Sequence, residues 1–323
     1  MRRIMPIVAL SISMLFGGAA LSETITISPT GGPPTTTIQV SGSGFAAMAA
    51  ITIDLATNSV PVTADGAGSF SNVAIQVPAS ALPGDYTVTA VVGSGGTLAQ
   101  TTFIVYTDWR QLGFAPNHPG SNPYENELSV STVGKLALLW DIPPTSSTAY
   151  SSAAVVNGVI YVSTYSLDNF NVYAFEASTG SQLWTFTTGA RAYPSPAVVN
   201  GVVYAGSDDD NVYALDASTG AKLWSYTTGG KVTSSPGVTN GKVFIGSLDN
   251  NLYAFNASTG EKLWNYTTGG SVTSSPAVAN GVVYVGSEDN NLYAIKASDG
   301  AKLWNYTTGG GVQASPAVVN GVV

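Results

Sequence analysis

The stretch ALDASTGAKLW, Ala214–Trp224, decides the fold because nearly the same string occurs four times. AFEASTGSQLW ends at Trp184, AFNASTGEKLW at Trp264 and AIKASDGAKLW at Trp304, so the tryptophans recur every 40 residues. The glycines of the strings keep the same interval. A fixed period of this length is typical of repeat architectures in which each unit packs on its neighbours.

Each unit is expected to form four strands. In the third copy the candidate strands are Val232–Asn240, Lys242–Ser247, Asn251–Ser258 and Lys262–Thr268. Asn240-Gly241 between the first two is a strong hairpin signal, because both residues tolerate positive φ. Four antiparallel strands in about forty residues is the pattern of one blade of a β-propeller.

The repeated string has a mechanical interpretation. Its Thr-Gly pair makes a tight turn, with glycine in a positive-φ position that other residues resist. The tryptophan then lies between neighbouring blades and buries roughly 200 Å² of ring surface. We therefore expect blade-docking roles for Trp140, Trp184, Trp224, Trp264, Trp304, Gly180, Gly220, Gly260 and Gly300.

Prolines recur in what reads as the first strand of each unit, at Pro194 or Pro196, then at Pro236, Pro276 and Pro316. Proline lacks the amide donor that a paired strand needs, so it belongs at a sheet edge. In a blade, the innermost strand has one unpaired side facing the central channel. The prolines therefore favour that position.

The first part of the chain differs in composition. Residues 24–105 alternate apolar and polar positions between Gly, Pro and Asp turns, which predicts about seven short strands in a β-sandwich. The phrases SGSGF (Ser41–Phe45), DGAGSF (Asp65–Phe70) and PGDYTVTA (Pro83–Ala90) resemble bacterial immunoglobulin-like domains of the IPT/TIG type. That resemblance implies a spacer or adhesive module.

Composition and charge exclude several classes of protein. Charged residues make up 9% of the 323 residues and the net charge is −8, with no basic cluster beyond the first residues, which argues against nucleic-acid binding. Cysteine is absent, so the chain has no disulfide, no thiol nucleophile and no lipoprotein anchor.

The N-terminus reads as a secretory signal peptide. Arg2 and Arg3 precede a mostly apolar run, Ile4–Phe16, and small residues lead to a cleavage site after Ser22. A membrane anchor is the alternative, but the run is shorter than the ~20 residues that a span requires. No other segment is apolar enough to span a bilayer, so we expect no membrane span after cleavage and a secreted, periplasmic or cell-surface protein.

The docking strings resemble the tryptophan-docking motif of the PQQ-like propeller family, the quinoprotein dehydrogenase repeats, over residues 108–323. DWRQLGFAPNHPGSNPY, Asp108–Tyr124, resembles the entry segment of such proteins. The expected fold is all-β. Its parts are a signal peptide (1–22), an immunoglobulin-like sandwich (23–105), a junction with the first propeller strands (106–150) and an incomplete propeller (151–323), with blades at 151–190, 191–230, 231–270 and 271–310 and a partial one at 311–323.

The resemblance leaves two functions open, secreted dehydrogenases and non-catalytic propellers. Quinoprotein alcohol dehydrogenases hold PQQ on a vicinal disulfide and need a Ca²⁺ site and a catalytic Asp. This chain has no cysteine, and its units are near copies that offer no one-off constellation. We expect a non-catalytic scaffold with a protein or glycan partner and no cofactor. The alternatives are a PQQ- and Ca²⁺-dependent dehydrogenase whose catalytic part lies beyond this chain, and part of a repetitive surface layer.

Positions that vary between copies are the candidate ligand contacts. After the outer strand the copies read Arg191, Lys231, Ser271 and Gly311, and at the turn between the second and third strands they read Asp208, Leu248 and Glu288. Both connections open on one face of a propeller, the usual funnel for ligands. The candidates there are Arg191, Tyr193, Asp208 and Lys231, unless the variation is drift at solvated positions.

Other motifs have ordinary explanations. Asp208–Asp210 has the carboxylates that Ca²⁺ favours, but Asp-Asn at a hairpin is common turn chemistry. Three sequons start at Asn256, Asn265 and Asn305, and His118, the single histidine, reads as a loop residue. SPAVVNGVV ends at Val323 inside an expected strand, which predicts a fragment of a longer product with about two to four further units.

Overall fold

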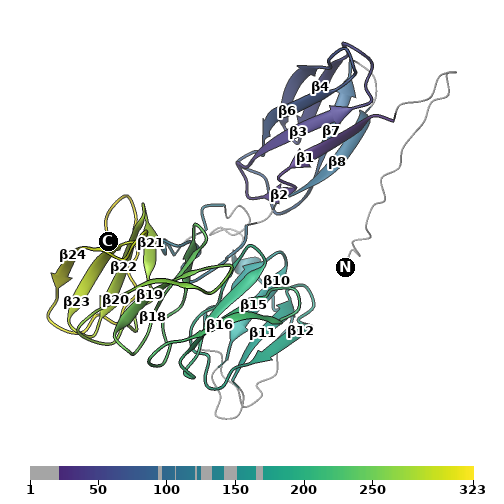
Figure 1. Ribbon diagram of the computed structural model, residues 1–323. Coiled ribbons are helices and arrows are strands. Elements are labelled where there is room, and N and C mark those ends of the chain that lie inside the picture. The colour runs from purple at the N-terminus through teal and green to yellow at the C-terminus, as the bar shows by residue number, and fades with distance from the viewer. Residues whose placement is uncertain are drawn as a thin grey trace. The chain divides into compact units, whose positions relative to one another are not determined.

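The computed structural model describes residues 22–93, 97–105, 107–120, 122–124, 133–141, 151–164 and 170–323. These residues form strands (Figure 1), with one short 3₁₀ helix, η1 (Val133–Lys135), in the described part. They divide into two compact units, one up to Thr107 with Tyr124 and 133–134, the other formed by 108–123 and the residues from Lys135 onward. The predicted signal peptide, 1–22, lies outside the described residues except for Ser22.

The first unit contains two sheets. One has the order β1-β3-β6 and the other β2-β8-β7-β4-β5, with β2 parallel to β8 and the other pairs antiparallel. The strands are β1 (Thr24–Ser28), β2 (Gly31–Gly32), β3 (Thr37–Ser43), β4 (Ala50–Leu55), β5 (Asn58–Thr63), β6 (Phe70–Gln76), β7 (Gly84–Val92) and β8 (Thr97–Val105).

The core of the first unit follows from period-two alternation. Ile38 and Val40 of β3 are buried, as are Ile51, Ile53 and Leu55 of β4, because alternate side chains of a strand face the same side. Residues of both sheets belong to one buried cluster. The predicted strands of this block are present, and the immunoglobulin-like class stays a prediction.

The second unit contains four sheets of four antiparallel strands, in teal to yellow in Figure 1. The first consists of β9 (Ala154–Val156), β10 (Val159–Ser163), β11 (Asn171–Glu176) and β12 (Gln182–Thr187). The others are β13 (Ala197–Val199), β14 (Val202–Gly206), β15 (Asn211–Asp216) and β16 (Lys222–Thr227); β17 (Gly237–Thr239), β18 (Lys242–Gly246), β19 (Asn251–Asn256) and β20 (Lys262–Thr267); and β21 (Ala277–Ala279), β22 (Val282–Ser287), β23 (Asn291–Lys296) and β24 (Lys302–Thr307). The predicted all-β class and four-stranded units are confirmed.

Local chemistry explains the strand ends. Asn200 and Gly201 have φ of 52° and 75°, and Asn240 and Gly241 have 48° and 70°, so both central residues of these hairpin turns are left-handed as their sequence predicts. The recurring prolines lie one residue before the first strand rather than inside it; β13 begins directly after Pro196. Their missing amide donor delays the start of the ladder.

The cores of the second unit lie between the sheets. One buried cluster combines Trp184 of the first sheet with Val203 and Leu215 of the second, and two further clusters join the second sheet to the third and the third to the fourth. A single sheet therefore leaves its faces uncovered until its neighbour packs on it. The innermost strands also lie beside one another, β13 next to β9 and β17, and β17 next to β21.

Candidate functional site

Four of the recurring tryptophans pack on the glycine turn of the sheet that follows them. The indole N–H of Trp184 donates to the Ala217 carbonyl at 2.9 Å, and the ring covers Gly220, three residues farther along the same turn. Equivalent contacts join Trp140 to Ala177 and Gly180, Trp224 to Ala257 and Gly260, and Trp264 to Ala297 and Gly300.

The glycine of this turn is required for two reasons. Gly260 has a φ of 72°, and a Cβ placed on it would lie 2.6 Å from Cδ2 of the Trp224 ring. Any larger residue is therefore strained in its backbone and collides with the indole. Trp184, Trp224 and Trp264 are 7–9% exposed under this contact, whereas Trp304, with no such turn against it in the described part of the chain, is 42% exposed.

A carboxylate ties the second, third and fourth sheets to the connection that leaves the sheet before each of them. Asp249 Oδ2 accepts hydrogen bonds from the Tyr253 hydroxyl at 2.5 Å and from the Gly229 amide at 2.7 Å, while Oδ1 accepts from the Asn251 amide at 3.0 Å. The same contacts occur at Asp209 with Tyr213 and Gly189, and at Asp289 with Tyr293 and Gly269.

These contacts shift the pKa of both partners. Burial alone would raise the pKa of Asp249, but the hydrogen bonds from Tyr253, Gly229 and Asn251 together lower it below its ordinary value. The pKa of Tyr253 is raised, mainly by burial and then by Asp249. Asp209, one of the aspartates considered for Ca²⁺, is therefore already bound to Tyr213 and an amide. In the described ranges, no group of three or more His, Cys, Asp or Glu residues could hold a metal ion.

A ladder of serines links the innermost segments. The amide of Ser195 donates to Ser235 Oγ at 2.9 Å, that of Ser235 to Ser275 Oγ at 2.9 Å, and that of Ser275 to Ser315 Oγ at 3.0 Å. The ladder starts with the Ser152 amide, which donates to Ser195 Oγ. Sequence analysis missed this contact, although a serine before the recurring proline was its visible signal.

One unrepeated segment, the axis segment (Trp109–His118), contacts all the innermost strands. Trp109 exchanges two backbone hydrogen bonds with Val155, at 2.7 and 2.8 Å. The amides of three further equivalent valines donate to successive main-chain carbonyls: Val198 to Arg110 at 2.7 Å, Val278 to Pro116 at 2.6 Å and Val318 to Asn117 at 2.8 Å.

The axis segment reaches the third sheet through a side chain. The Val238 amide donates to Oε1 of Gln111 at 3.0 Å, and Gln111 is 4% exposed. Ten residues extend about 35 Å at most, so equivalent atoms of five units contact this segment only because the units converge on one centre. That convergence is the arrangement of a β-propeller.

His118 closes the axis segment. Its Nδ1 lies 3.1 Å from the Pro316 carbonyl, and its side chain is buried. Burial lowers the pKa of His118, and the hydrogen bond to Pro316 opposes this only in part. The neutral imidazole with a proton on Nδ1 fits this contact. His118 is a loop residue, as the sequence predicts, and its side chain is buried.

The four candidate ligand contacts lie at one end of the sheets, which we call the funnel face: the turns between second and third strands and the connections that follow the outer strands. Lys231 Nζ lies 3.1 Å from Asp208 Oδ2, and the Asp208 amide donates to the Arg191 carbonyl at 2.8 Å. Arg191 Nη1 donates to the Tyr193 hydroxyl at 3.4 Å.

The varying positions of the funnel face form pairs between neighbouring units. Lys231 pairs with Asp208, and at the next junction Ser271 Oγ donates to the Leu248 carbonyl at 3.1 Å. At the third junction Gly311 leaves room for Glu288, because a Cβ on Gly311 would lie 2.5 Å from Glu288 Oε2. The varying positions therefore meet in a different way at each junction, by an ion pair, by a hydrogen bond to a main-chain carbonyl and by close approach to a glycine, which the sequence alone did not reveal.

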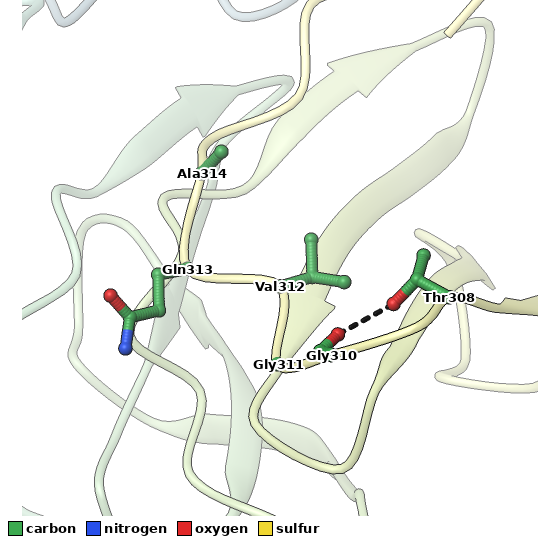
Figure 2. Close-up of a pocket in the computed structure, with 6 residues that line it drawn as sticks. All are labelled: Thr308, Gly310, Gly311, Val312, Gln313 and Ala314. Carbon is green, nitrogen blue, oxygen red and sulfur yellow. Dashed lines mark hydrogen bonds between the residues drawn. The ribbon is translucent and has the colours of Figure 1, made fainter.

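A hollow of about 400 Å³ lies at the end of the funnel face (Figure 2), lined by Thr308, Gly310, Gly311, Val312, Gln313 and Ala314. The Thr308 hydroxyl donates to the Gly310 carbonyl at 2.6 Å and shapes its wall. A second hollow of about 600 Å³ lies beside the exposed Trp304 and Tyr306. Neither contains a charged side chain in its lining.

Membrane insertion through a helix finds no support in the described residues, where no helix has the length and apolar character of a span. A search of curated proteins finds no match.

Solved structures with a similar fold include the quinohemoprotein alcohol dehydrogenase ADHIIG from Pseudomonas putida HK5, with 22% identity and a TM-score of 0.56 over 62% of this chain and 40% of that one. The quinohemoprotein alcohol dehydrogenase from Comamonas testosteroni has 21% identity and a TM-score of 0.52, over 64% of this chain and 42% of that one. BamB from Moraxella catarrhalis has 16% identity and a TM-score of 0.43, over 53% of this chain and 65% of that one. The chain thus spans 40–65% of these structures.

The two dehydrogenase structures show the propeller fold of the second unit and, at this identity, nothing about its chemistry. A family model covers most of that unit, in two matches at residues 109–234 and 228–323. The model is described as outer membrane protein assembly factor BamB, and its span includes the axis segment and all four sheets. The chain belongs to this PQQ-like, BamB-type repeat family.

Proposed function

We propose that this protein is a secreted, non-catalytic β-propeller scaffold that holds a protein or glycan partner on its funnel face, at the cell surface or in the periplasm. The observation that carries the proposal is where the copies differ. The Trp–Gly, serine–serine and Asp–Tyr contacts repeat from sheet to sheet. The residue types change at three pairs of positions, Asp208–Lys231, Leu248–Ser271 and Glu288–Gly311. A partner that distinguishes near-identical sheets must contact such positions.

Membership of the family supports a protein partner. The family's description names an assembly factor of outer membrane proteins, a role that requires contact with other proteins outside the cytoplasmic membrane. We propose that the segment 1–22 is a cleaved signal peptide that sends the chain there. The first unit then serves as an immunoglobulin-like spacer, and the absence of cysteine leaves no lipid attachment site.

The quinoprotein alternative places its catalytic part beyond this chain, because the chain itself does not offer the donors that the resemblance implies. The resemblance implies a vicinal disulfide against PQQ, and the sequence has no cysteine. It also implies a Ca²⁺ site, yet Asp209, Asp249 and Asp289 are each bound by a tyrosine and an amide. The residues present do not fit this cofactor pair, and we propose no step through it.

Site-specific photo-cross-linking tests the proposal. A photoreactive amino acid replaces Ser271 on the funnel face, in the full chain, in cells that produce it. Ser258, in the exposed turn between β19 and β20 at the opposite end of the same sheets, is the matched control. We expect a covalent adduct of defined mass from position 271 and none from position 258.

A second arm tests whether this chain by itself supports quinone-dependent turnover. The purified chain is incubated with PQQ and Ca²⁺, and reduction of an electron-acceptor dye is followed with alcohols and sugars as substrates. We expect no reduction above the rate without PQQ. Quinone-dependent turnover, or equal adducts from positions 271 and 258, overturns the proposal.

A further inference from the structure

In the Asp208–Lys231 pair, only one of the two carboxylate oxygens has a partner. Oδ2 of Asp208 contacts Lys231 Nζ at 3.1 Å, and the Asp208 side chain is 6% exposed while that of Lys231 is 53% exposed. Oδ1 of the same carboxylate is buried and has no hydrogen-bond partner. An unpaired buried carboxylate oxygen is costly, because the low-dielectric interior does not replace the water it has lost.

A second unpaired polar atom lies next along the chain. Oγ1 of Thr233, two residues after Lys231, is also buried without a partner. Its copy in the next unit is Thr273, whose Oγ1 donates to Oε1 of Glu288 at 3.5 Å. Thr233 lacks that bond because the residue equivalent to Glu288 in its own unit is Leu248, which has no side-chain acceptor.

The fold does not require these unpaired atoms. At the next junction the same backbone carries Leu248 and Ser271, with the serine hydroxyl donating to a carbonyl. At the third junction Glu288 takes the hydroxyl of Thr273. The unpaired oxygen of Asp208 therefore belongs to one junction, at the connection after the second sheet, and a leucine–serine pair is sterically compatible with the same position.

Charge and geometry narrow the class of ligand. Lys231 and Asp208 neutralise each other, so the pair offers no net charge to an ion. It offers one acceptor on Asp208 and the remaining donors of the half-exposed Lys231 ammonium. A sugar with adjacent hydroxyl groups complements both. The half-exposed Lys231 side chain is the movable part, since an exposed ion pair holds it weakly.

The surroundings favour a small polar ligand at the surface. Tyr193, in the connection that precedes β13, brings an aromatic ring to the same face, and Arg191 donates to its hydroxyl. The axis segment contacts the innermost strands at Val198 and Val238.

We propose that Asp208 and Lys231 form a binding site for a neutral glycan, with a sugar hydroxyl donating to Asp208 Oδ1 and a second accepting from Lys231. This inference rests on the proposed scaffold function and names the partner chemistry of one junction. A peptide partner at the same junction is the competing outcome.

The copies supply matched variants for the test. The double variant Asp208→Leu with Lys231→Ser reproduces the Leu248–Ser271 pair that the fold already carries, so it is expected to fold. The control, Glu288→Leu with Gly311→Ser, makes the same replacement at the third junction. Each labelled full chain is applied to an array of neutral and anionic oligosaccharides, and the best neutral sugar is titrated by calorimetry.

We expect the wild type and the control to bind the same neutral sugar with equal affinity, and the Asp208→Leu/Lys231→Ser variant to bind at least about tenfold more weakly. Binding of the wild type changes little between about 0.05 and 0.5 M salt, since a neutral ligand is not screened. Equal affinity of all three chains overturns the glycan site.

The two proposals fail in distinguishable ways. An empty array together with a protein adduct at position 271 overturns the glycan site and leaves the scaffold function standing, with a peptide partner. Binding of anionic sugars alone, lost in salt, also overturns the neutral site. An empty array with no adduct at all overturns both proposals.

Discussion

The rim and the axis of the propeller hold the same sheets together by opposite means. At the rim, one contact recurs with the same residue types: a tryptophan, the glycine of the next turn and an alanine carbonyl. At the axis, equivalent valine amides meet different partners, because a single unrepeated segment passes them in turn. The comparison shows that contacts which repeat join neighbouring units, whereas one unrepeated segment contacts several units at once.

Truncation of a rim tryptophan is the strongest way to break the comparison. Trp224→Ala removes a buried ring and the hydrogen bond to Ala257, so we expect a loss of about 3–5 kcal/mol in the free energy of unfolding. Trp304→Ala removes a ring that is 42% exposed, and we expect a loss of about 1 kcal/mol. Urea denaturation of the full chain, followed by far-ultraviolet circular dichroism, measures both. Equal losses contradict the assigned role of the covered ring.

Glycine replacement separates backbone strain from the collision with the ring. Gly260→Ala meets both, because its φ is 72° and its new Cβ lies 2.6 Å from the Trp224 ring. We expect a loss of about 2–4 kcal/mol.

Gly241→Ala is the control for that variant. Gly241 has a φ of 70° and nothing within 4 Å of its Cβ position, so only strain remains, at about 1–2 kcal/mol. Thermal unfolding by calorimetry compares the two. A control that is as unstable as Gly260→Ala removes the ring contact from the explanation.

Gln111→Ala tests the axis. It leaves the Val238 amide without an acceptor in a buried site, and we expect a loss of about 1–3 kcal/mol. Hydrogen exchange adds a local readout, since protection of the Val238 amide should fall more than that of Val198, which donates to a main-chain carbonyl. The exposed Gln313→Ala is the control. An unchanged Val238 amide contradicts the role of the Gln111 side chain.

The Trp–Gly contacts at the rim were predictable because they are made by residue types that recur at a fixed interval. Trp224 and Gly260 belong to one recurring string, and Asn240-Gly241 encodes its turn locally. The contacts at the axis were not predictable from the sequence. The main-chain carbonyls of Arg110, Pro116 and Asn117 accept hydrogen bonds from valine amides there, and because every residue has a carbonyl, no residue type marks these positions.

The funnel face lies between these cases. Varying positions were visible in the sequence, but not their pairing, since Lys231 and Asp208 are 23 residues apart and belong to neighbouring units. The sequence also did not reveal that the hydroxyl of Thr233 is unpaired. This becomes clear from the structure, in which the equivalent Thr273 donates to Glu288. The repeat in the sequence identifies which positions differ between units, and the structure shows which of these positions contact one another.

The smallest expected effect distinguishes two tyrosines by pH. Tyr253 donates to a carboxylate, Asp249, whose pKa is lowered in the fold, so the stability from this pair is full above the ordinary pKa of 3.8 and is lost as pH falls through the lowered value. Tyr204 donates instead to the Ala257 carbonyl, which does not titrate, and burial raises the pKa of Tyr204 to about 12.

Removal of each hydroxyl should therefore cost stability with a different pH dependence. Tyr253→Phe is expected to lower the melting temperature at neutral pH, by the equivalent of about 1 kcal/mol, and the gap to the wild type should narrow as the pH falls below the ordinary pKa of 3.8 and Asp249 becomes protonated. Tyr204→Phe should lower it by an amount that stays constant over the same range, because neither partner changes charge there. Parallel gaps for both variants would mean that Asp249 is not held as an anion by Tyr253, and that the repeated carboxylate contributes only shape to the junction between sheets.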